Sequence, residues 1–257
     1  MFKNIYPLFE RKRVLKKEML ENLRDYPRDM FTFMFQEYAN GILTGCRIEV
    51  RMEKLVIHPG IVYHSGIPYF LDEPYSIPYH PTGTVQYLKI HFSDRTEGPG
   101  QEEHLTKVIL DEEAAEDGCE MELVRFKLQE GAKLRDQHVD FFDHSTEFDT
   151  LQLIHAPYAS PEKSSIAPQI LKAYAAALMV YPLQNPWDCA FCLEAMKGRI
   201  LPYEEISTYL NARMREPKAG YTNMEIYDSL RRLVLEVSGK EISGRRTERK
   251  ERKLLLM

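Results

Sequence analysis

The chain has 257 residues, of which 44% are hydrophobic, and a formal net charge of −5. This length allows a sizeable buried core, and we expect two domains rather than one. The first residues lack the apolar run of a signal peptide, and no stretch approaches the roughly 20 apolar residues of a membrane span. These features predict a soluble, cytoplasmic protein with no membrane partner.

Four cysteines in a chain this long do not form a disulfide framework. Their spacing favours reduced thiols that fill the core.

Charge is spread unevenly along the chain. Residues 94–122 contain eleven acidic and two basic residues, whereas residues 243–253 contain six basic and two acidic residues. Such charged runs are usually solvated, so we disfavour a nucleic-acid partner. The alternative is a nucleic-acid-binding regulator that uses the basic tail, residues 243–257. For the acidic loop, residues 111–117, two interpretations stay open: it binds a partner, or it keeps the β domain soluble.

The first 40 residues are predicted to be helical. Leu15, Met19 and Leu23 recur every four residues, which indicates an amphipathic helix over residues 13–25 that ends at Pro27. Residues 29–38, rich in aromatic residues and methionine, are predicted to form a second short helix. We expect these aromatic side chains to pack in the core.

An antiparallel β domain is predicted over residues 41–130. The alternation of Cys46, Ile48, Val50 and Met52 with charged residues is typical of a strand with one buried face. Short apolar runs at residues 55–58, 61–63 and 67–71 follow through tight turns and indicate a meander.

The second half of the β domain is predicted to contain three more strands. A proline-rich connection at residues 73–84 is expected to be irregular, and residues 94–103 to be a polar loop. Strands are predicted at residues 85–92, 105–110 and 120–128, and the last has a break in alternation at Leu123 and Val124 that indicates a bulge.

Helical patterns dominate the rest of the chain. After an irregular linker at residues 131–162, residues 163–242 should form a small bundle with helices at 168–181 and 202–215. Asn185-Pro186 is typical of a helix start, and Thr222 with Glu225 has the form of a capping box. The predicted fold class is therefore α+β: N-terminal helices, an antiparallel β-sandwich or barrel-like meander, and a C-terminal small helical bundle.

One cluster could carry chemistry. His138, Asp140, Asp143 and His144 are the candidate metal ligands, and a metal-dependent hydrolase built on residues 138–149 is an alternative function. Their spacing matches neither an EF-hand nor a helical pair of ligands. A surface linker rich in acids explains the same residues, so we assign no catalytic residue, no metal and no cofactor.

Cys189 and Cys192 form a Cys-x-x-Cys pair without a second pair of ligands at matching spacing. Two small residues three apart on a helix usually share its buried face, so we interpret the pair as core packing. The chain also lacks the glycine-rich nucleotide-binding motifs and the Gly-x-Ser-x-Gly elbow of serine hydrolases.

Three stretches together resemble a known family: LRDYPRD at residues 23–29, YANGILTGC at 38–46, and LVIHPGIVY at 55–63 followed by Ser65-Gly66-Ile67. This pattern is similar to the N-terminal region of bacteriophage tail and baseplate proteins, and it covers about residues 18–92. The resemblance implies a helical start and a β domain that docks to neighbouring tail subunits. It supplies no catalytic residue.

Unlike many tail-fibre proteins, this chain continues into a compact helical bundle rather than a repetitive shaft. The resemblance therefore favours a non-enzymatic structural or adaptor subunit of a prophage or phage-tail-like (contractile injection) assembly, docking through its β domain. The expected partners are other tail or baseplate subunits, with a homo-oligomer left open. The expected location is the cytoplasm or an assembled particle.

Overall fold

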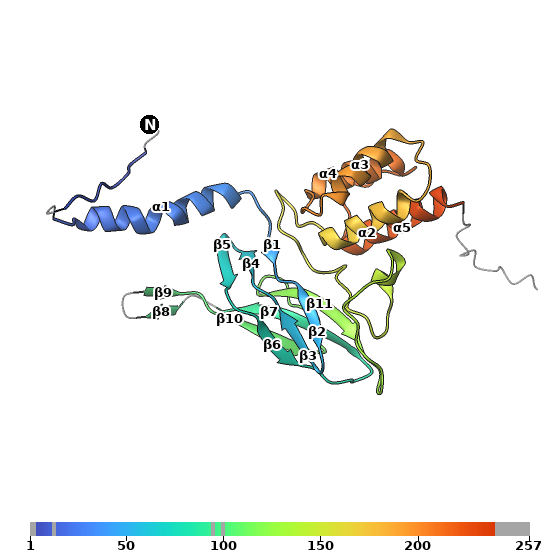
Figure 1. Cartoon of the computed structure of the whole chain (residues 1–257), viewed down its shortest axis with the longest axis horizontal. Helices are drawn as coiled ribbons and strands as arrows, with labels where there is room; N and C mark the ends of the chain where they lie inside the picture. The colour runs from blue at the N-terminus through green and yellow to red at the C-terminus, as the bar shows by residue number, and fades with distance from the viewer. Residues whose placement is uncertain (1–3, 12–13, 94–95, 99–100, 240–257) are drawn as a thin grey trace, which may run out of the picture.

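The computed structural model describes residues 4–11, 14–93, 96–98 and 101–239. The protein has an α+β fold whose β layers lie between one long helix, α1, and a cluster of four helices, α2 to α5 (Figure 1). This confirms the predicted fold class, with sheets that do not close into a barrel.

The N-terminal segment forms one helix rather than two. α1 spans Lys17–Phe35 and contains Pro27 in its interior, so the prediction that Pro27 ends a helix is wrong. An interior proline removes one backbone donor and crowds the preceding turn, at a cost of about 3 kcal/mol. The helix nevertheless continues to Phe35, and the rings of Phe31 and Phe35 contact the sandwich beyond the proline.

Residues 41–78 form a three-stranded meander in which each strand is bent in the middle, as predicted in outline. Its six segments are β1 (Gly41–Gly45), β2 (Ile48–Arg51), β3 (Lys54–Ile57), β4 (Gly60–His64), β5 (Ile67–Leu71) and β6 (Tyr75–Pro78). β1, β4 and β5 pair on one side of the bend, and β2, β3 and β6 pair on the other. Between the first two strands, the Cys46 N–H donates to Pro59 O at 3.2 Å and the His58 N–H to Arg47 O at 2.9 Å, so hydrogen bonding continues through the bend.

Glycine makes the bend sterically possible. A Cβ atom on Gly60 would lie 2.3 Å from the backbone nitrogen of Cys46, and one on Gly45, where φ is +68°, would lie 2.2 Å from Pro59 O. The bend also interrupts the predicted alternation, because Cys46 has φ +53° and only residues 48–51 form a strand there. Met52 therefore lies in a turn with its side chain in solvent.

The second sheet has β7 (Val85–Phe92) at its centre, between β10 (Thr106–Asp111) and β11 (Glu120–Lys127). These strands agree with the predicted positions, and the register shift between Glu122 and Val124 confirms the predicted bulge. Two predictions for the connections are wrong: the proline-rich stretch contains β6, and the expected polar loop contains a hairpin of β8 (Thr96–Gly98) and β9 (Gln101–Glu103).

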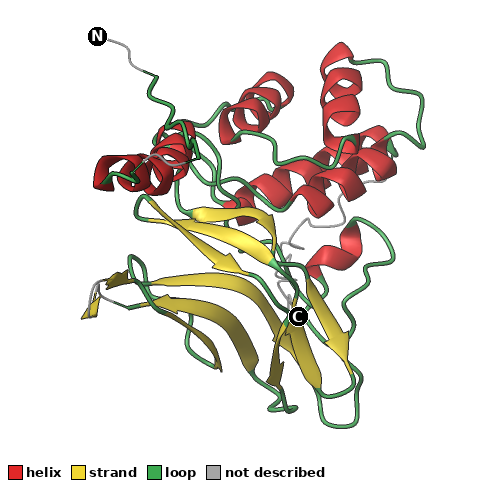
Figure 2. Ribbon diagram, turned by 60° about the vertical axis from the view of Figure 1, so that its left-hand side comes forward, coloured by secondary structure: helices red, strands yellow, loops and turns green. Residues whose placement is uncertain are grey.

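The two sheets pack face to face as a sandwich (Figure 2). Ring contacts cross the interface: His64 on β4 stacks on Phe92 of β7 at 3.8 Å, and Tyr79 meets Phe126 of β11 edge-on at 5.7 Å. The aliphatic core between the sheets includes Leu55 and Leu88, both fully buried.

An irregular segment, residues 129–166, joins the sandwich to the helices. It contains one 3₁₀ turn, η1 (Phe142–Ser145), and pairs with the sandwich through isolated bridges such as Arg125 with Gln152. Much of it is buried rather than at the surface, because Phe141, Leu151 and Ile154 each expose 2% or less. The tyrosine ring of Tyr227 covers Phe141 at 4.9 Å.

Four helices complete the described fold: α2 (Pro168–Leu178), α3 (Pro186–Met196), α4 (Tyr203–Arg213) and α5 (Asn223–Val237). Both predicted caps are present. The Asn185 side chain accepts a hydrogen bond from the Trp187 N–H at 2.9 Å, and Thr222 and Glu225 form a reciprocal capping box. Among the described helices, none has the length and apolar character needed to cross a membrane.

Candidate interaction surfaces

The predicted metal ligands lie on and around η1, where the carboxylate of Asp143 is already hydrogen-bonded to other groups of the protein. Asp143 accepts two hydrogen bonds from the Arg135 guanidinium, at 3.0 and 3.1 Å, and others from the Val139 N–H and the Thr146 hydroxyl. The guanidinium holds the pKa of Asp143 well below its usual range. Asp140 instead accepts the Asp143 N–H at 3.0 Å. Both carboxylates thus shape the turn.

The two histidines of this cluster meet each other rather than an ion. Their rings stack at 3.9 Å, His138 Nε2 lies 2.7 Å from Leu151 O, and His144 is buried. Burial lowers the pKa of both rings, to about 3 for His144. Over the described part of the chain, no group of three or more His, Cys, Asp and Glu side chains is placed to hold a metal ion.

The cysteines do not share one environment. Cys46 and Cys192 are buried, and burial raises their thiol pKa values to about 11 and about 12. Cys189 is exposed, so the prediction that Cys189 and Cys192 share a buried face is wrong. Cys119 is partly exposed, which also differs from the expected core position.

The acidic loop between β10 and β11 is tied to the sheet by a buried lysine. Lys89 of β7 lies 3.1 Å from Asp111 and 3.0 Å from Glu120, and its Nζ also donates to Glu113 O. These ion pairs with Lys89 give a structural role to Asp111 and Glu120, the acidic residues at the two ends of the loop. The basic tail, residues 243–257, falls outside the described residues.

A cleft of about 960 Å³ lies beside the loop that joins α4 to α5. Its walls carry charges of both signs, and two pairs of these contact each other, Lys218 with Glu225 at 2.7 Å and Arg213 with Glu236 at 3.5 Å. No set of converging acid, base and nucleophile appears among the residues that line it.

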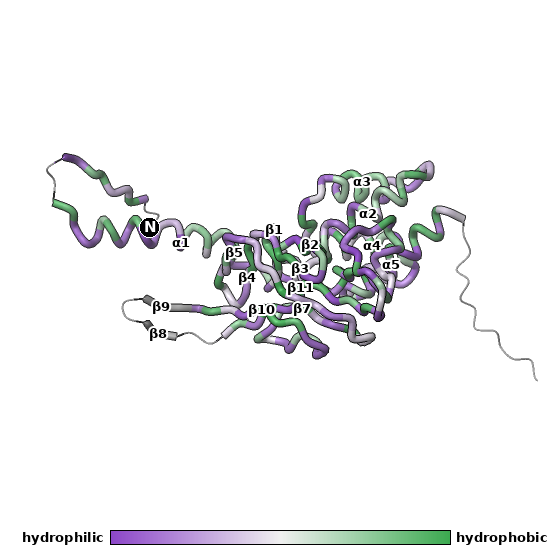
Figure 3. The backbone as a smooth tube through the Cα atoms, turned by 60° about the horizontal axis from the view of Figure 1, so that its bottom comes forward, coloured by the Kyte–Doolittle hydropathy of each residue, from purple (hydrophilic) through white to green (hydrophobic). Residues whose placement is uncertain are grey.

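Two elements project away from the body on the side opposite the helical cluster (Figures 1 and 3). They are α1 and the β8–β9 hairpin, whose strands pair with each other and with no other strand in the described part of the chain. α1 has no buried residue, and its large apolar side chains Met30, Phe33 and Met34 are exposed. The expectation that the aromatic and methionine residues of this segment fill the core is therefore wrong for these positions.

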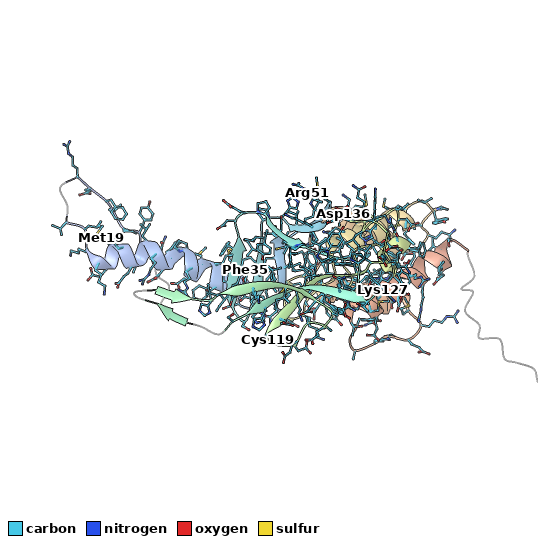
Figure 4. All side chains as sticks on the ribbon, turned by 90° about the horizontal axis from the view of Figure 1, so that it is seen from below. Met19, Phe35, Arg51, Cys119, Lys127 and Asp136 are labelled. Carbon is cyan, nitrogen blue, oxygen red and sulfur yellow. The ribbon has the colours of Figure 1, made fainter. Side chains whose placement is uncertain are left out.

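α1 contacts the sandwich near its C-terminal end. Figure 4 shows Met19 far out along the helix and Phe35 where the helix meets the body. Phe35 lies 6.3 Å from the Tyr63 ring, and Phe31 lies 6.3 Å from Phe70 on the edge strand β5. The exposed helix was not foreseen because an amphipathic pattern looks the same whether its partner is in the chain or outside it.

Comparisons with known proteins give no family. No protein-family model matches the sequence, and no curated protein matches it.

Three solved structures show a weak likeness of fold. A crystal structure of TssK aligns over 93% of this chain and 72% of its own, with 10% identity and a TM-score of 0.44. A chain of the type VI secretion system TssK-TssF-TssG baseplate subcomplex aligns over 90% and 99%, with 9% identity and a TM-score of 0.42. A chain of the type VI secretion system baseplate complex aligns over 91% and 70%, with 9% identity and a TM-score of 0.37. TM-scores and identities this low assign neither a family nor a function.

Proposed function

We propose that this chain is a non-enzymatic structural or adaptor subunit of a phage-tail-like, contractile-injection type of assembly, and that it docks to other tail or baseplate subunits through its β domain. The observation that carries the proposal is the pair of projecting elements, α1 and the β8–β9 hairpin. A helix with an interior proline and no buried residue is marginal alone in water, and so is a two-stranded hairpin. Both gain stability when another subunit covers them.

The N-terminal resemblance to tail and baseplate proteins supplies the kind of assembly. It covers α1 and the bent meander, the part of the chain from which the projecting helix emerges. The edge strand β5 adds an apolar contact beside the base of α1, because Phe70 exposes 60% of its surface. Exposed aromatic side chains on rigid elements are common at protein interfaces.

The test is co-sedimentation with particles in a producing strain. Particles are purified on a density gradient from cells that express the tagged chain, and the fractions are probed for the tag. We expect the wild-type chain in the particle fractions and Phe70→Asp largely in the free fractions, because a buried unpaired carboxylate opposes docking. Val139→Asp is the matched control, since Val139 is an equally apolar, exposed residue outside the β domain.

Complete particles that form without the chain, or a wild-type chain that never enters the particle fractions, would show that the proposed function is wrong. Loss of both variants from the particles would exclude docking through the β5 edge.

A further inference from the structure

α1 carries an apolar face that is mostly exposed in the described chain. Its exposed large apolar residues are Leu20 (47%), Leu23 (56%), Tyr26 (53%), Met30 (46%), Phe33 (69%) and Met34 (64%). If side chains of this size present roughly 200 Å² each when free, these exposures sum to on the order of 600 Å² per chain, against about 800 Å² per partner in a typical stable complex. Two such faces together would bury on the order of 1,200 Å², which is the lower end of the range for a stable interface.

The spacing of this face specifies a helical partner. Met19, Leu23, Tyr26, Met30 and Phe33 are separated by four, three, four and three residues, which is the spacing of the a and d positions of a coiled coil. We name these five residues the α1 seam. Phe31 and Phe35 lie between a third and a half of a turn from the centre of this seam, and their rings contact the sandwich. While the helix is anchored there, four of the seam residues stay exposed and Met19 stays partly exposed.

The flanks of the α1 seam favour identical helices over a charged partner. No charged side chain interrupts the five positions, and charges on the far side are paired within the helix, Lys17 with Glu21 at 3.2 Å and Arg24 with Asp25 at 2.6 Å. Parallel, in-register packing places every seam residue against its own equivalent, so no apolar position is left over. Leu20 and Met34 widen the face on one side, which suits a ring of more than two helices.

We propose that the α1 helices of three or more copies of this chain pack parallel and in register through the α1 seam. The occupant of this apolar face is thus the same helix of another copy. Self-association of this kind requires no particle, so it goes beyond the proposed function and stands or falls separately.

The first test is the mass of the purified full-length chain in solution, measured by light scattering after gel filtration at high micromolar concentration. We expect a solution mass of at least three times the 30.1 kDa of a single chain. The double variant Leu23→Glu/Met30→Glu should fall to the monomer mass, because it buries unpaired charges in the α1 seam. The control Arg28→Glu/Thr32→Glu alters the polar face and should keep the wild-type mass.

Disulfide trapping tests the register. In a Cys119→Ser/Cys189→Ser background, Tyr26→Cys should form an inter-chain disulfide on mild oxidation, whereas Thr32→Cys on the opposite face should not. Circular dichroism of each variant shows whether the fold is kept.

A monomeric wild-type chain would overturn the proposal, as would a multimer that survives the seam variant or a failure of Tyr26→Cys to cross-link. If the chain forms the multimer but does not enter particles, the proposed function is wrong and the self-association through the α1 seam still holds.

Discussion

At the scale of single residues, the buried carboxylate of Asp188 joins three helices of the bundle. Its Oδ1 accepts the Tyr209 hydroxyl at 2.8 Å and the Arg213 Nε–H at 2.7 Å, and the Tyr209 hydroxyl also bonds that of Tyr174 on α2. Removing one partner of a buried ion pair leaves the other charge without compensation, which typically costs about 3–5 kcal/mol. We therefore expect Asp188→Ala to lower the free energy of unfolding by about that amount, measured by urea denaturation.

Glu194→Ala on the same helix is the matched control. Glu194 pairs with Lys197 and Arg199 at the surface, where solvent screens the charges, so this variant should leave the unfolding midpoint nearly unchanged. Equal losses in the two variants would mean that Asp188 contributes no more than a surface pair.

The buried His144 makes stability depend on pH. Its side chain exposes 3% of its surface, and burial together with the neighbouring His138 lowers its pKa from 6.5 to about 3. Between these values the unfolded chain binds a proton that the folded chain does not, so stability falls as the pH falls, by about 1.4 kcal/mol per pH unit at most. We expect His144→Gln to reduce this slope between pH 6 and pH 4, measured by urea denaturation at each pH.

His80→Gln serves as the comparison because His80 is exposed. It should retain the wild-type slope. If His144→Gln kept the wild-type slope of stability against pH, His144 would not be the group that takes up a proton when the chain unfolds.

The same residues show what the sequence could indicate about a site. It singled out His138, Asp140, Asp143 and His144 by residue type alone. It could not show that Arg135, which is held opposite Thr150 by an isolated bridge, places its guanidinium on Asp143. That contact depends on the path of an irregular segment, and residue type carries no information about such a path.

At the scale of elements, local signals were the reliable ones. Asn185 before Pro186 and Thr222 with Glu225 are contained within four residues, and both mark helix starts as predicted. Signals that depend on distant partners were not reliable. β6 forms in a proline-rich stretch because it pairs with β3 as an edge strand, where the missing N–H of Pro78 is tolerated.

Pro27 gives a prediction about α1 itself. The proline deprives the Leu23 carbonyl of its helical donor in a helix that no other element buries. Pro27→Ala restores this hydrogen bond and should strengthen the helix by up to about 3 kcal/mol. The expected readout is slower amide hydrogen exchange across residues 17–35, with no slowing in the sandwich.

Pro168→Ala is the control, because Pro168 occupies the first turn of α2, where proline costs little. Its amide exchange should match that of the wild-type protein. Unaltered exchange in α1 of Pro27→Ala would mean that contacts with other copies, rather than helix propensity, already hold α1 in place.

At the scale of the whole molecule, one buried cluster runs from the sandwich into the bundle. It includes Leu88 and Phe126 between the sheets, Phe141 in the irregular segment, and Tyr174 and Tyr227 in the helices. The Tyr227 hydroxyl donates to Phe141 O at 2.9 Å, so polar contacts also cross the join. The division at residues 131–162 into two domains stays a prediction about where the architecture changes along the chain.

A continuous core couples the two halves energetically, because unfolding the bundle would expose Phe141 and the apolar residues beside it to water. We therefore expect one thermal transition by calorimetry, with equal calorimetric and van't Hoff enthalpies. For Asp188→Ala, we expect the same unfolding midpoint from the fluorescence of Trp187, which reports on the bundle, and from far-UV circular dichroism, which reports on the whole chain. Two resolved transitions, with only the bundle probe shifted by Asp188→Ala, would show that the halves unfold independently and that residues 131–162 act as a hinge between separate domains.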